Sequence, residues 1–257
     1  MEVITSDQNR IYKSVSKLRM KKYRDRTGLY LVDGRKLVEE ALAAGLCEMI
    51  IVRDDYQIDM EHRGNDFTFI RGSLFNKIAQ TETSQGIMAV VRKRDVDEEA
   101  FLSLISRGSG NVVVLDRLQD PGNIGTIIRT ADAAGYDGVI AVRGTGDVYS
   151  PKTVRAAMGS VMRIPVYLTE DASQCVETLR RAGKKIVGTD IDAKVNYFDE
   201  DMTENTAVVI GNEGAGMSEE FRNGSDVNVK IPMTGAVDSL NAAVAAGILI
   251  YQSVEKR

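Results

Sequence analysis

The sequence has no tryptophan, one histidine and two cysteines among its 257 residues. With His62 as the single histidine, we expect neither a Ser-His-Asp triad nor a metal site built from several histidines. Cys47 and Cys175 lie far apart and lack the close spacing of metal ligands, which favours a reducing, cytoplasmic setting. We therefore expect no metal, and any chemistry has to use other side chains.

Long apolar runs are also missing. No segment reaches the roughly 20 apolar residues that a membrane-spanning helix needs, and the opening residues MEVITSDQNR do not have the pattern of a signal peptide. The composition is ordinary for a globular protein. A chain of 257 residues can bury a full core, in one large domain or in two small ones.

The net charge of -4 conceals a basic segment, because Arg10 to Arg26 carries eight lysines and arginines and only one acidic residue. Ile11, Val15 and Leu18 recur at i, i+4 and i+7, which predicts a helix over residues 10–23. Its basic side chains point largely away from the apolar stripe. They are either a solvated helix face or a local contact with a polyanion. The candidate nucleic-acid contacts are Lys13, Lys17, Lys21 and Lys22.

The first 93 residues alternate short apolar runs with amphipathic segments, which predicts a small α/β domain. The predicted strands are 29–32, 49–52, 67–70 and 87–91, and the predicted helices after the basic one are 34–44 and 73–79. Residues 94–110 are charged and then rich in glycine and serine, which predicts a linker.

Residues 111–257 show the same alternation more strongly and predict one parallel-sheet α/β domain with helices on both faces. The predicted strands are 112–115, 139–142, 164–167, 185–188, 207–210 and 227–231. The predicted helices are 124–134, one that starts at Ser150-Pro151, 173–182, and a final helix that Asp238 and Ser239 cap.

Three loops of this domain carry unusual polar residues where ligands bind to open α/β sheets, at the carboxyl ends of the strands. The first is Asp120 to Gly125, which leads into a helix that bears Arg129. The second, Gly211 to Met217, is glycine-rich and contains Glu213, but it matches neither the dinucleotide pattern nor a P-loop. The third, Ile231 to Asn241, holds Ser239. Taken singly, each is also explained as a surface turn or a helix cap.

Together the three loops resemble the motifs of the SpoU/TrmH family of RNA ribose 2′-O-methyltransferases. Asn123, Gly125 and Arg129 match its N-x-G-x-x-x-R motif, Gly211 to Gly216 match G-N-E-G-x-G, and Ile231 to Asn241 match I-P-M-x-G-x-x-x-S-L-N. The N-terminal half resembles the RNA-binding domain, shared with some ribosomal proteins, that many members carry. The phrase TETSQGIMAV at residues 81–90 is similar to the end of that domain.

The resemblance implies a trefoil knot in the C-terminal domain and S-adenosylmethionine as cofactor. It also implies a homodimer whose active site is completed across the interface. The family's catalytic positions fall on Asn123, Arg129, Glu213, Ser239 and Asn241. Its cofactor contacts fall on Gly211, Ile231 and Leu240, with Thr189 near the preceding strand end. An attached RNA-binding domain favours ribosomal RNA over transfer RNA. The alternative from another class is a non-catalytic RNA-binding or ribosome-assembly factor on the same fold.

These residue types suit methyl transfer to a ribose 2′-hydroxyl, which must be held in line with the donor and must lose a proton. Asn123, Ser239 and Asn241 can fix geometry by neutral hydrogen bonds, and Glu213 can orient amide or guanidinium groups. The family's proposed proton acceptor is Arg129, although a guanidinium stays protonated in proteins. Two roles therefore stay open for Arg129, a relay to an RNA phosphate or stabilisation of the developing oxyanion.

Overall fold

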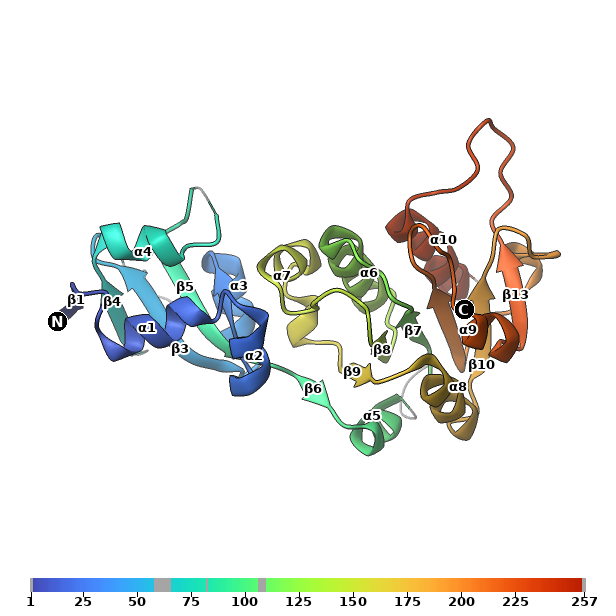
Figure 1. Cartoon of the computed structure of the whole chain (residues 1–257), viewed down its shortest axis with the longest axis horizontal. Helices are drawn as coiled ribbons and strands as arrows, with labels where there is room; N and C mark the ends of the chain where they lie inside the picture. Colours follow the sequence, from blue (N-terminus) through green and yellow to red (C-terminus); the bar gives the residue numbers. More distant parts are fainter. Residues whose placement is uncertain (1, 58–65, 82, 106–109, 256–257) are drawn as a thin grey trace.

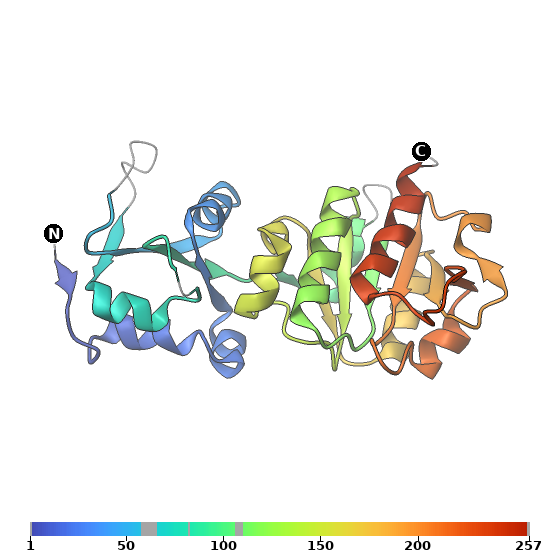
Figure 2. The same cartoon turned by 90° about the horizontal axis from the view of Figure 1, so that it is seen from above.

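The computed structural model describes residues 2–57, 66–81, 83–105 and 110–255. Two α/β halves follow one another along the long axis of the molecule, the N-terminal half in blue to teal and the C-terminal half in green to red (Figures 1 and 2). His62, the single histidine of the sequence, lies outside the described residues.

The N-terminal half is the predicted small α/β unit. Its strands are β1 Val3–Ile4, β2 Leu29–Asp33, β3 Cys47–Arg53, β4 Phe67–Ile70 and β5 Ile87–Arg92. Its helices are α1 Arg10–Lys17, α2 Lys21–Thr27, α3 Arg35–Ala43 and α4 Gly72–Ile78. The described strands form one mixed sheet in the order β1-β4-β3-β5-β2.

The basic segment is two helices rather than the single helix predicted over 10–23. Asn9 caps α1, and the chain is extended at Met20 before α2 begins. Leu18 ends α1 with its side chain buried, and its carbonyl accepts a hydrogen bond of 2.7 Å from Nη1 of Arg24. The spacing of Ile11, Val15 and Leu18 reports only local helical periodicity. It could not predict this break, because the residue that stabilises the break is Arg24, in the next helix.

The C-terminal half is the predicted parallel-sheet domain. Its strands are β6 Asp95–Val96, β7 Val112–Leu115, β8 Gly138–Val142, β9 Val166–Thr169, β10 Lys185–Thr189, β11 Val195–Asn196, β12 Thr206–Ile210 and β13 Val227–Lys230. Its α-helices are α5 Glu98–Ile105, α6 Pro121–Ala133, α7 Pro151–Ala157, α8 Ala172–Arg181, α9 Glu219–Gly224 and α10 Ala242–Glu255. Two 3-10 turns are η2 Ser160–Met162 and η3 Tyr197–Asp199.

The described strands of this half form one sheet in the order β11-β13-β10-β12-β7-β8-β9-β6, and every pairing is parallel. Alternate residues of the central strands face opposite layers, as the strand period requires. Val113 and Leu115 of β7 pack under α6, α7 and α10, whereas Val112 and Val114 pack under α5, α8 and α9. This burial on both faces explains the continuous apolar runs of the sequence.

The segment predicted as a linker, 94–110, contributes structure to the C-terminal half. β6 pairs with β9 at the edge of the large sheet, and α5 packs on β8 and β9. Phe101 and Ile105 of α5 are fully buried. The helix was not predicted from the sequence, because its short apolar stretch lies between a charged start and a Gly/Ser-rich end of the segment.

Two helices begin at other residues than predicted. α6 starts at Pro121, because Oδ1 of Asp120 accepts the N–H of Asn123 at 2.9 Å and caps it. α10 starts at Ala242, because Oδ1 of Asn241 accepts the N–H groups of Ala243 and Val244 at 2.9 and 3.3 Å. The prediction that Asp238 and Ser239 cap α10 was therefore wrong.

The strand predicted at 164–167 is displaced to 166–169 because Pro165 precedes it without an N–H to donate.

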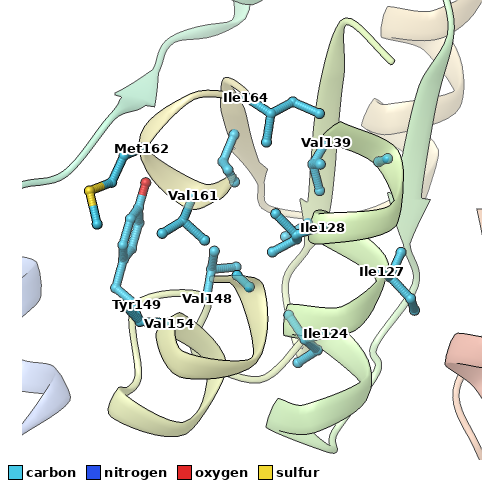
Figure 3. Packing of buried hydrophobic residues seen from close by; sticks show 14 of the residues in the cluster. Ile124, Ile127, Ile128, Val139, Val148, Tyr149, Val154, Val161, Met162 and Ile164 are labelled. Carbon is cyan, nitrogen blue, oxygen red and sulfur yellow. The ribbon is translucent and has the colours of Figure 1, made fainter. Parts of the chain in front are cut away.

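The two halves share one apolar core. Tyr30 of β2 packs on Tyr149, which precedes α7, with 4.9 Å between the ring centroids. The same cluster of buried residues continues between α6 and α7, where Figure 3 shows Ile124, Ile128, Val148, Val154 and Val161. Because this core is continuous, the N-terminal half has a defined position on the C-terminal half.

Polar contacts frame the shared core. The buried guanidinium of Arg24 pairs with the carboxylate of Asp147, and Nη1 of Arg155 donates to the carbonyl of Gln80 at 2.9 Å. Arg163 bridges Glu40 in the N-terminal half and Asp132 in the C-terminal half. A buried arginine without its carboxylate would be costly, so these pairs make the docked arrangement specific.

Gly125 of the first motif lets α6 and α7 approach closely. A Cβ at this position would lie 2.4 Å from the carbonyl oxygen of Thr153 and 2.6 Å from Cβ of Ala156. Backbone atoms cannot rotate away from such a contact. This glycine therefore shapes the packing beneath the motif rather than touching a ligand.

We expect Gly125→Ala to lower the free energy of unfolding by about 1–2 kcal/mol, since overpacking outweighs the better helix propensity of alanine. Urea denaturation monitored by circular dichroism measures the change. Thr126→Ala, at the exposed neighbouring position, is the control and should stay within about 0.5 kcal/mol of the parent. Equal stability of Gly125→Ala and the parent would contradict the steric argument.

Candidate functional site

The three motif loops meet at the carboxyl ends of four neighbouring strands, in the order β13-β10-β12-β7. Thr189 ends β10, Gly211 follows β12 and Ile231 follows β13. The register of the sheet brings them to the same edge, because Gly188 lies opposite Val209 and Thr189 opposite Val229. Three of the four predicted cofactor residues therefore line one side of the sheet edge, where α/β sheets bind ligands.

The loop from Gly211 to Met217 folds tightly on itself. The backbones of Asn212 and Gly216 exchange two hydrogen bonds of 3.0 and 2.9 Å. Oδ1 of Asn212 accepts the N–H groups of Gly214 and Ala215, and its Nδ2 donates to the carbonyl of Arg117 at 2.8 Å. A Cβ on Gly211 would lie 2.4 Å from the backbone nitrogen of Met217, so only glycine fits there.

Glu213 connects this loop to the first motif. Its carboxylate accepts the backbone N–H of Gln119 at 3.0 Å, the backbone N–H of Asp120 at 3.1 Å and Nδ2 of Asn123 at 3.1 Å. Burial alone would raise the pKa of Glu213, but these hydrogen bonds favour the charged form and hold the pKa below its ordinary value. The carboxylate is thus a structural anion at the start of α6, where the helix dipole also favours negative charge.

Asn123 connects the first motif to the third. Its Oδ1 accepts a hydrogen bond of 2.9 Å from Nδ2 of Asn241, while its Nδ2 donates to Glu213. Asn241 in turn uses Oδ1 to cap α10. The side chains of Glu213, Asn123 and Asn241 therefore form one chain of hydrogen bonds through all three motifs, although they are up to 118 residues apart.

Arg129 and Ser239 do not join that chain. Both side chains are exposed, and among the described residues neither has a hydrogen-bond or ion-pair partner. Arg129 follows Asn123 by six residues on α6, which corresponds to about 9 Å along the helix axis. The chain of hydrogen bonds thus connects three of the five predicted catalytic residues. The side chains of Arg129 and Ser239 lie outside it and keep their polar groups free.

The segment that carries Ser239 and Leu240 has unpaired backbone. From Met233 to Leu240 no hydrogen bond joins the backbone to any other part of the described chain. Leu240, the fourth predicted cofactor residue, is about one-third exposed. Backbone donors and acceptors that lack internal partners need water or a ligand.

Thr189 already has partners within the protein. Its hydroxyl donates to the carbonyl of Val209 at 2.9 Å, and its N–H points at the sulfur of Met217 at 3.1 Å. The side chain thus ties β10 to β12 and to the end of the glycine-rich loop.

Sequence reasoning missed Asp116, the residue directly after β7. Its side chain is fully buried, and Oδ2 accepts the N–H of Ser218 at 2.6 Å just beyond the glycine-rich loop. Its Oδ1 accepts a hydrogen bond of 3.1 Å from Nε of Arg117. A carboxylate that directly follows a buried apolar strand was the available signal, since such a charge needs specific partners.

The predicted nucleic-acid lysines lie on α1 and α2. Lys13 donates to Oε1 of Gln8, and Lys17 lies 5.4 Å from the ring centroid of Tyr23. Lys21 forms an exposed ion pair of 3.0 Å with Asp25, and Lys22 is exposed. Three of these four lysines therefore keep their charge free of a carboxylate partner within the described chain.

Two features are absent from the described residues. None of the helices is both long and apolar enough to cross a lipid bilayer. No group of three or more His, Cys, Asp and Glu side chains converges there in a way that could hold a metal ion.

Two protein families match separate parts of the chain. Residues 110–251 match the SpoU rRNA Methylase family, and residues 9–89 match the MRM3-like substrate binding domain. The chain is 38% identical over 254 residues to the 23S rRNA (guanosine(2553)-2′-O)-methyltransferase RlmP of Bacillus subtilis strain 168, with 98% of each chain covered.

Solved structures show the same two-part architecture. An AdoMet-bound rRNA methyltransferase from Sinorhizobium meliloti superposes with a TM-score of 0.87 at 31% identity, covering 99% of this chain and 98% of that one. The SpoU methyltransferase AviRb from Streptomyces viridochromogenes, in complex with AdoMet, superposes with a TM-score of 0.81 at 29% identity, covering 97% and 98%. The family match spans more than half of the chain and includes all three motif loops, so this chain belongs to the SpoU rRNA methylase family.

Proposed function

We propose that this chain is an enzyme that transfers a methyl group from S-adenosylmethionine to a ribose 2′-hydroxyl of ribosomal RNA. The observation that carries the proposal is the hydrogen-bonded chain of Glu213, Asn123 and Asn241 at the carboxyl edge of the sheet. The relative in Bacillus subtilis is named as a 23S rRNA 2′-O-methyltransferase, and it aligns over nearly the whole length.

The sheet edge fits the cofactor. Thr189, Gly211, Ile231 and Leu240 would hold S-adenosylmethionine, largely through backbone groups. The absence of a side chain at Gly211 lets the glycine-rich loop fold back to Met217 at this edge. The backbone from Met233 to Leu240 offers donors and acceptors that have no partner within the described chain. The bound cofactor supplies a methyl group activated by its sulfonium.

The remaining task of the protein is to position the ribose and to handle one proton. Asn123 has both ends of its amide fixed, by Glu213 on one side and Asn241 on the other, so its rotamer is held before substrate arrives. Ser239 and Arg129 keep free polar groups that can contact the ribose and the developing oxyanion. Arg129, whose backbone is positioned by α6, acts as a cation near the developing oxyanion or relays the proton to a phosphate of the RNA.

A second copy of the chain completes this site. α10 is apolar on nearly every side, as is typical of a buried helix, yet Val244, Tyr251 and Val254 are 52%, 44% and 36% exposed. With Gly247, where an added Cβ would meet no other part of the described chain within 4 Å, these residues form a stripe at i, i+3, i+7 and i+10 beside the third motif. A homodimer on this stripe would bury it and bring a second α6 near the first site.

The N-terminal half binds the RNA, and Lys13, Lys17, Lys21 and Lys22 contact its phosphates. The match of residues 9–89 to a substrate binding domain supports this role. We further propose a trefoil knot in the C-terminal domain and a cytoplasmic location. Domains 1–93 and 111–257 are joined by residues 94–110, which add β6 and α5 to the C-terminal half. Free Cys47 and Cys175 suit a reducing compartment.

Incubation of the purified protein with S-adenosylmethionine and 23S rRNA transcribed in vitro tests the reaction. Mass spectrometry of nuclease fragments should find one ribose that gained a methyl group, and RNA from a deletion strain should lack that methyl group. Methylation of a transfer RNA transcript alone would favour the tRNA alternative. RNA binding without methylation of either would identify a non-catalytic assembly factor.

We expect Arg129→Ala to lower the single-turnover rate at saturating RNA by at least about 100-fold, the typical loss for one preorganised donor. Arg129→Lys should lose nearly as much, because lysine lacks the planar fork. The affinity for S-adenosylmethionine, measured by calorimetry, should change little. A near-normal single-turnover rate for Arg129→Ala would remove Arg129 from the catalytic residues.

Glu213→Gln should slow methyl transfer and destabilise the protein at neutral pH, because one amide oxygen cannot accept three N–H groups. The pKa of Glu213 lies below its ordinary value of 4.5, so its stabilisation is present above that pH and is lost as the pH falls through the lowered pKa. The stability difference between parent and variant, from denaturant titrations, should therefore shrink below about pH 4.5. A difference independent of pH would contradict a role for the carboxylate charge.

Tyr251→Glu should convert the homodimer to monomers, because a carboxylate on the apolar stripe would be buried without a partner. Sedimentation velocity measures the mass, and methyl transfer should be lost with the dimer. Leu168→Glu introduces the same charge at another half-exposed apolar residue, on β9, and should leave the dimer intact. A dimer that survives Tyr251→Glu would place the interface elsewhere.

A further inference from the structure

The N-terminal half contains a cleft between α1 and α2 that none of the three motifs uses. Its volume is about 430 Å³, within the range of small-ligand sites. The break between the two helices creates it. Its lining includes Arg10, Lys13, Lys17, Tyr23 and Arg26.

The cleft concentrates positive charge that the protein itself does not neutralise. Arg10, Lys13, Lys17 and Arg26 all line it, and within the described chain none of the four forms an ion pair with a carboxylate. Lys21 and Arg24 on the same helical segment are paired, with Asp25 and Asp147 respectively. Four like charges around one cleft repel each other and favour an anionic occupant.

An aromatic ring lies among these charges. The half-buried ring of Tyr23 has Nζ of Lys17 5.4 Å and the guanidinium carbon of Arg26 4.9 Å from its centroid. Both cations lie over the ring, so a base that stacks on Tyr23 takes the place of one of them and leaves that cation to bind a phosphate. That combination is characteristic of sites for single-stranded nucleic acid, in which unpaired bases stack on aromatic side chains.

The cleft is connected to the candidate active site by direct contacts. Arg24 of α2 pairs with Asp147, whose neighbour Gly146 donates its N–H to the carbonyl of Leu118 at 2.8 Å. The next residue, Gln119, donates its N–H to Glu213. In Figure 2, the blue helices α1 and α2 and the start of the red helix α10 lie along the same edge of the molecule. The cleft and the candidate active site are therefore linked through α2, the loop before α7 and the loop before α6.

We propose that this cleft binds one unpaired nucleotide of the substrate RNA, with its base stacked on Tyr23 and its phosphates on Lys13, Lys17 and Arg26. The inference rests on the proposed function, because it takes RNA as the substrate. It adds a specific nucleotide site, outside the catalytic motifs, that distinguishes an unpaired strand from a duplex.

Binding of a short oligoadenylate and of a short RNA duplex to the full-length protein tests the site. Loss of one base–aromatic stack corresponds to about a 5- to 150-fold loss of affinity. Tyr23→Leu should show such a loss for the single strand and little change for the duplex, whereas Tyr23→Phe should bind both like the parent. Arg26→Ala, an exposed position that does not threaten the fold, should also weaken the single strand more than the duplex.

Lys22→Ala is the matched charge control, because Lys22 is exposed on α2 and does not line the cleft. It should weaken both RNAs equally and only by the salt-dependent contribution of one phosphate contact. Equal losses for the two RNAs in Tyr23→Leu and Arg26→Ala would overturn the nucleotide site, as would a Tyr23→Phe variant that fails like Tyr23→Leu.

Failure of the proposed function gives a different result. In that case the parent protein would not methylate the 23S rRNA transcript, while the single-strand preference and its dependence on Tyr23 would persist. Conversely, a parent that methylates the transcript, with a Tyr23→Leu variant of unchanged single-strand affinity, would leave the enzyme assigned and remove only the cleft.

Discussion

The candidate site depends on the hydrogen bonds that the carboxylate of Glu213 accepts. This carboxylate collects two backbone N–H groups and one side-chain amide from the start of α6, and each of these donors would otherwise lack a partner. Through Asn123 the same carboxylate fixes Asn241, and Asn241 starts α10. Three loops that are far apart in the sequence thus depend on one anion for their relative positions.

A second constraint joins this site to the N-terminal half. The aromatic pair of Tyr30 and Tyr149 and the ion pair of Arg24 and Asp147 dock α2 against the loop that precedes α7. In that loop the N–H of Gly146 donates to the carbonyl of Leu118. The next residue, Gln119, donates its own N–H to the carboxylate of Glu213. The surface proposed to bind RNA is therefore held at a defined place relative to the methyl-transfer site, which is what positioning of one ribose requires.

Much of this arrangement could be predicted from the sequence. Continuous β-branched runs such as β7 predicted the buried parallel strands, and the order of three short motifs predicted the family and the location of the site. Sequence patterns failed to predict helix ends that are stabilised by a residue distant in the sequence. Arg24 satisfies the carbonyl exposed by the break after α1, and Asn241 rather than Ser239 caps α10 while bonded to Asn123. Asp116 was missed because only its partner across the sheet edge shows why a buried charge is tolerated.

The isolation of Arg129 and Ser239 has a physical logic in a transferase. Glu213, Asn123 and Asn241 satisfy one another and set geometry, so they are poor candidates for groups that change partners during the reaction. A group that must meet a ribose and a developing charge has to be unpaired beforehand, because breaking an existing hydrogen bond would raise the barrier. The exposed apolar stripe on α10 begins at Val244, five residues after Ser239. Its burial by a second copy would remove water from the site and strengthen the field of Arg129 on the reacting oxygen.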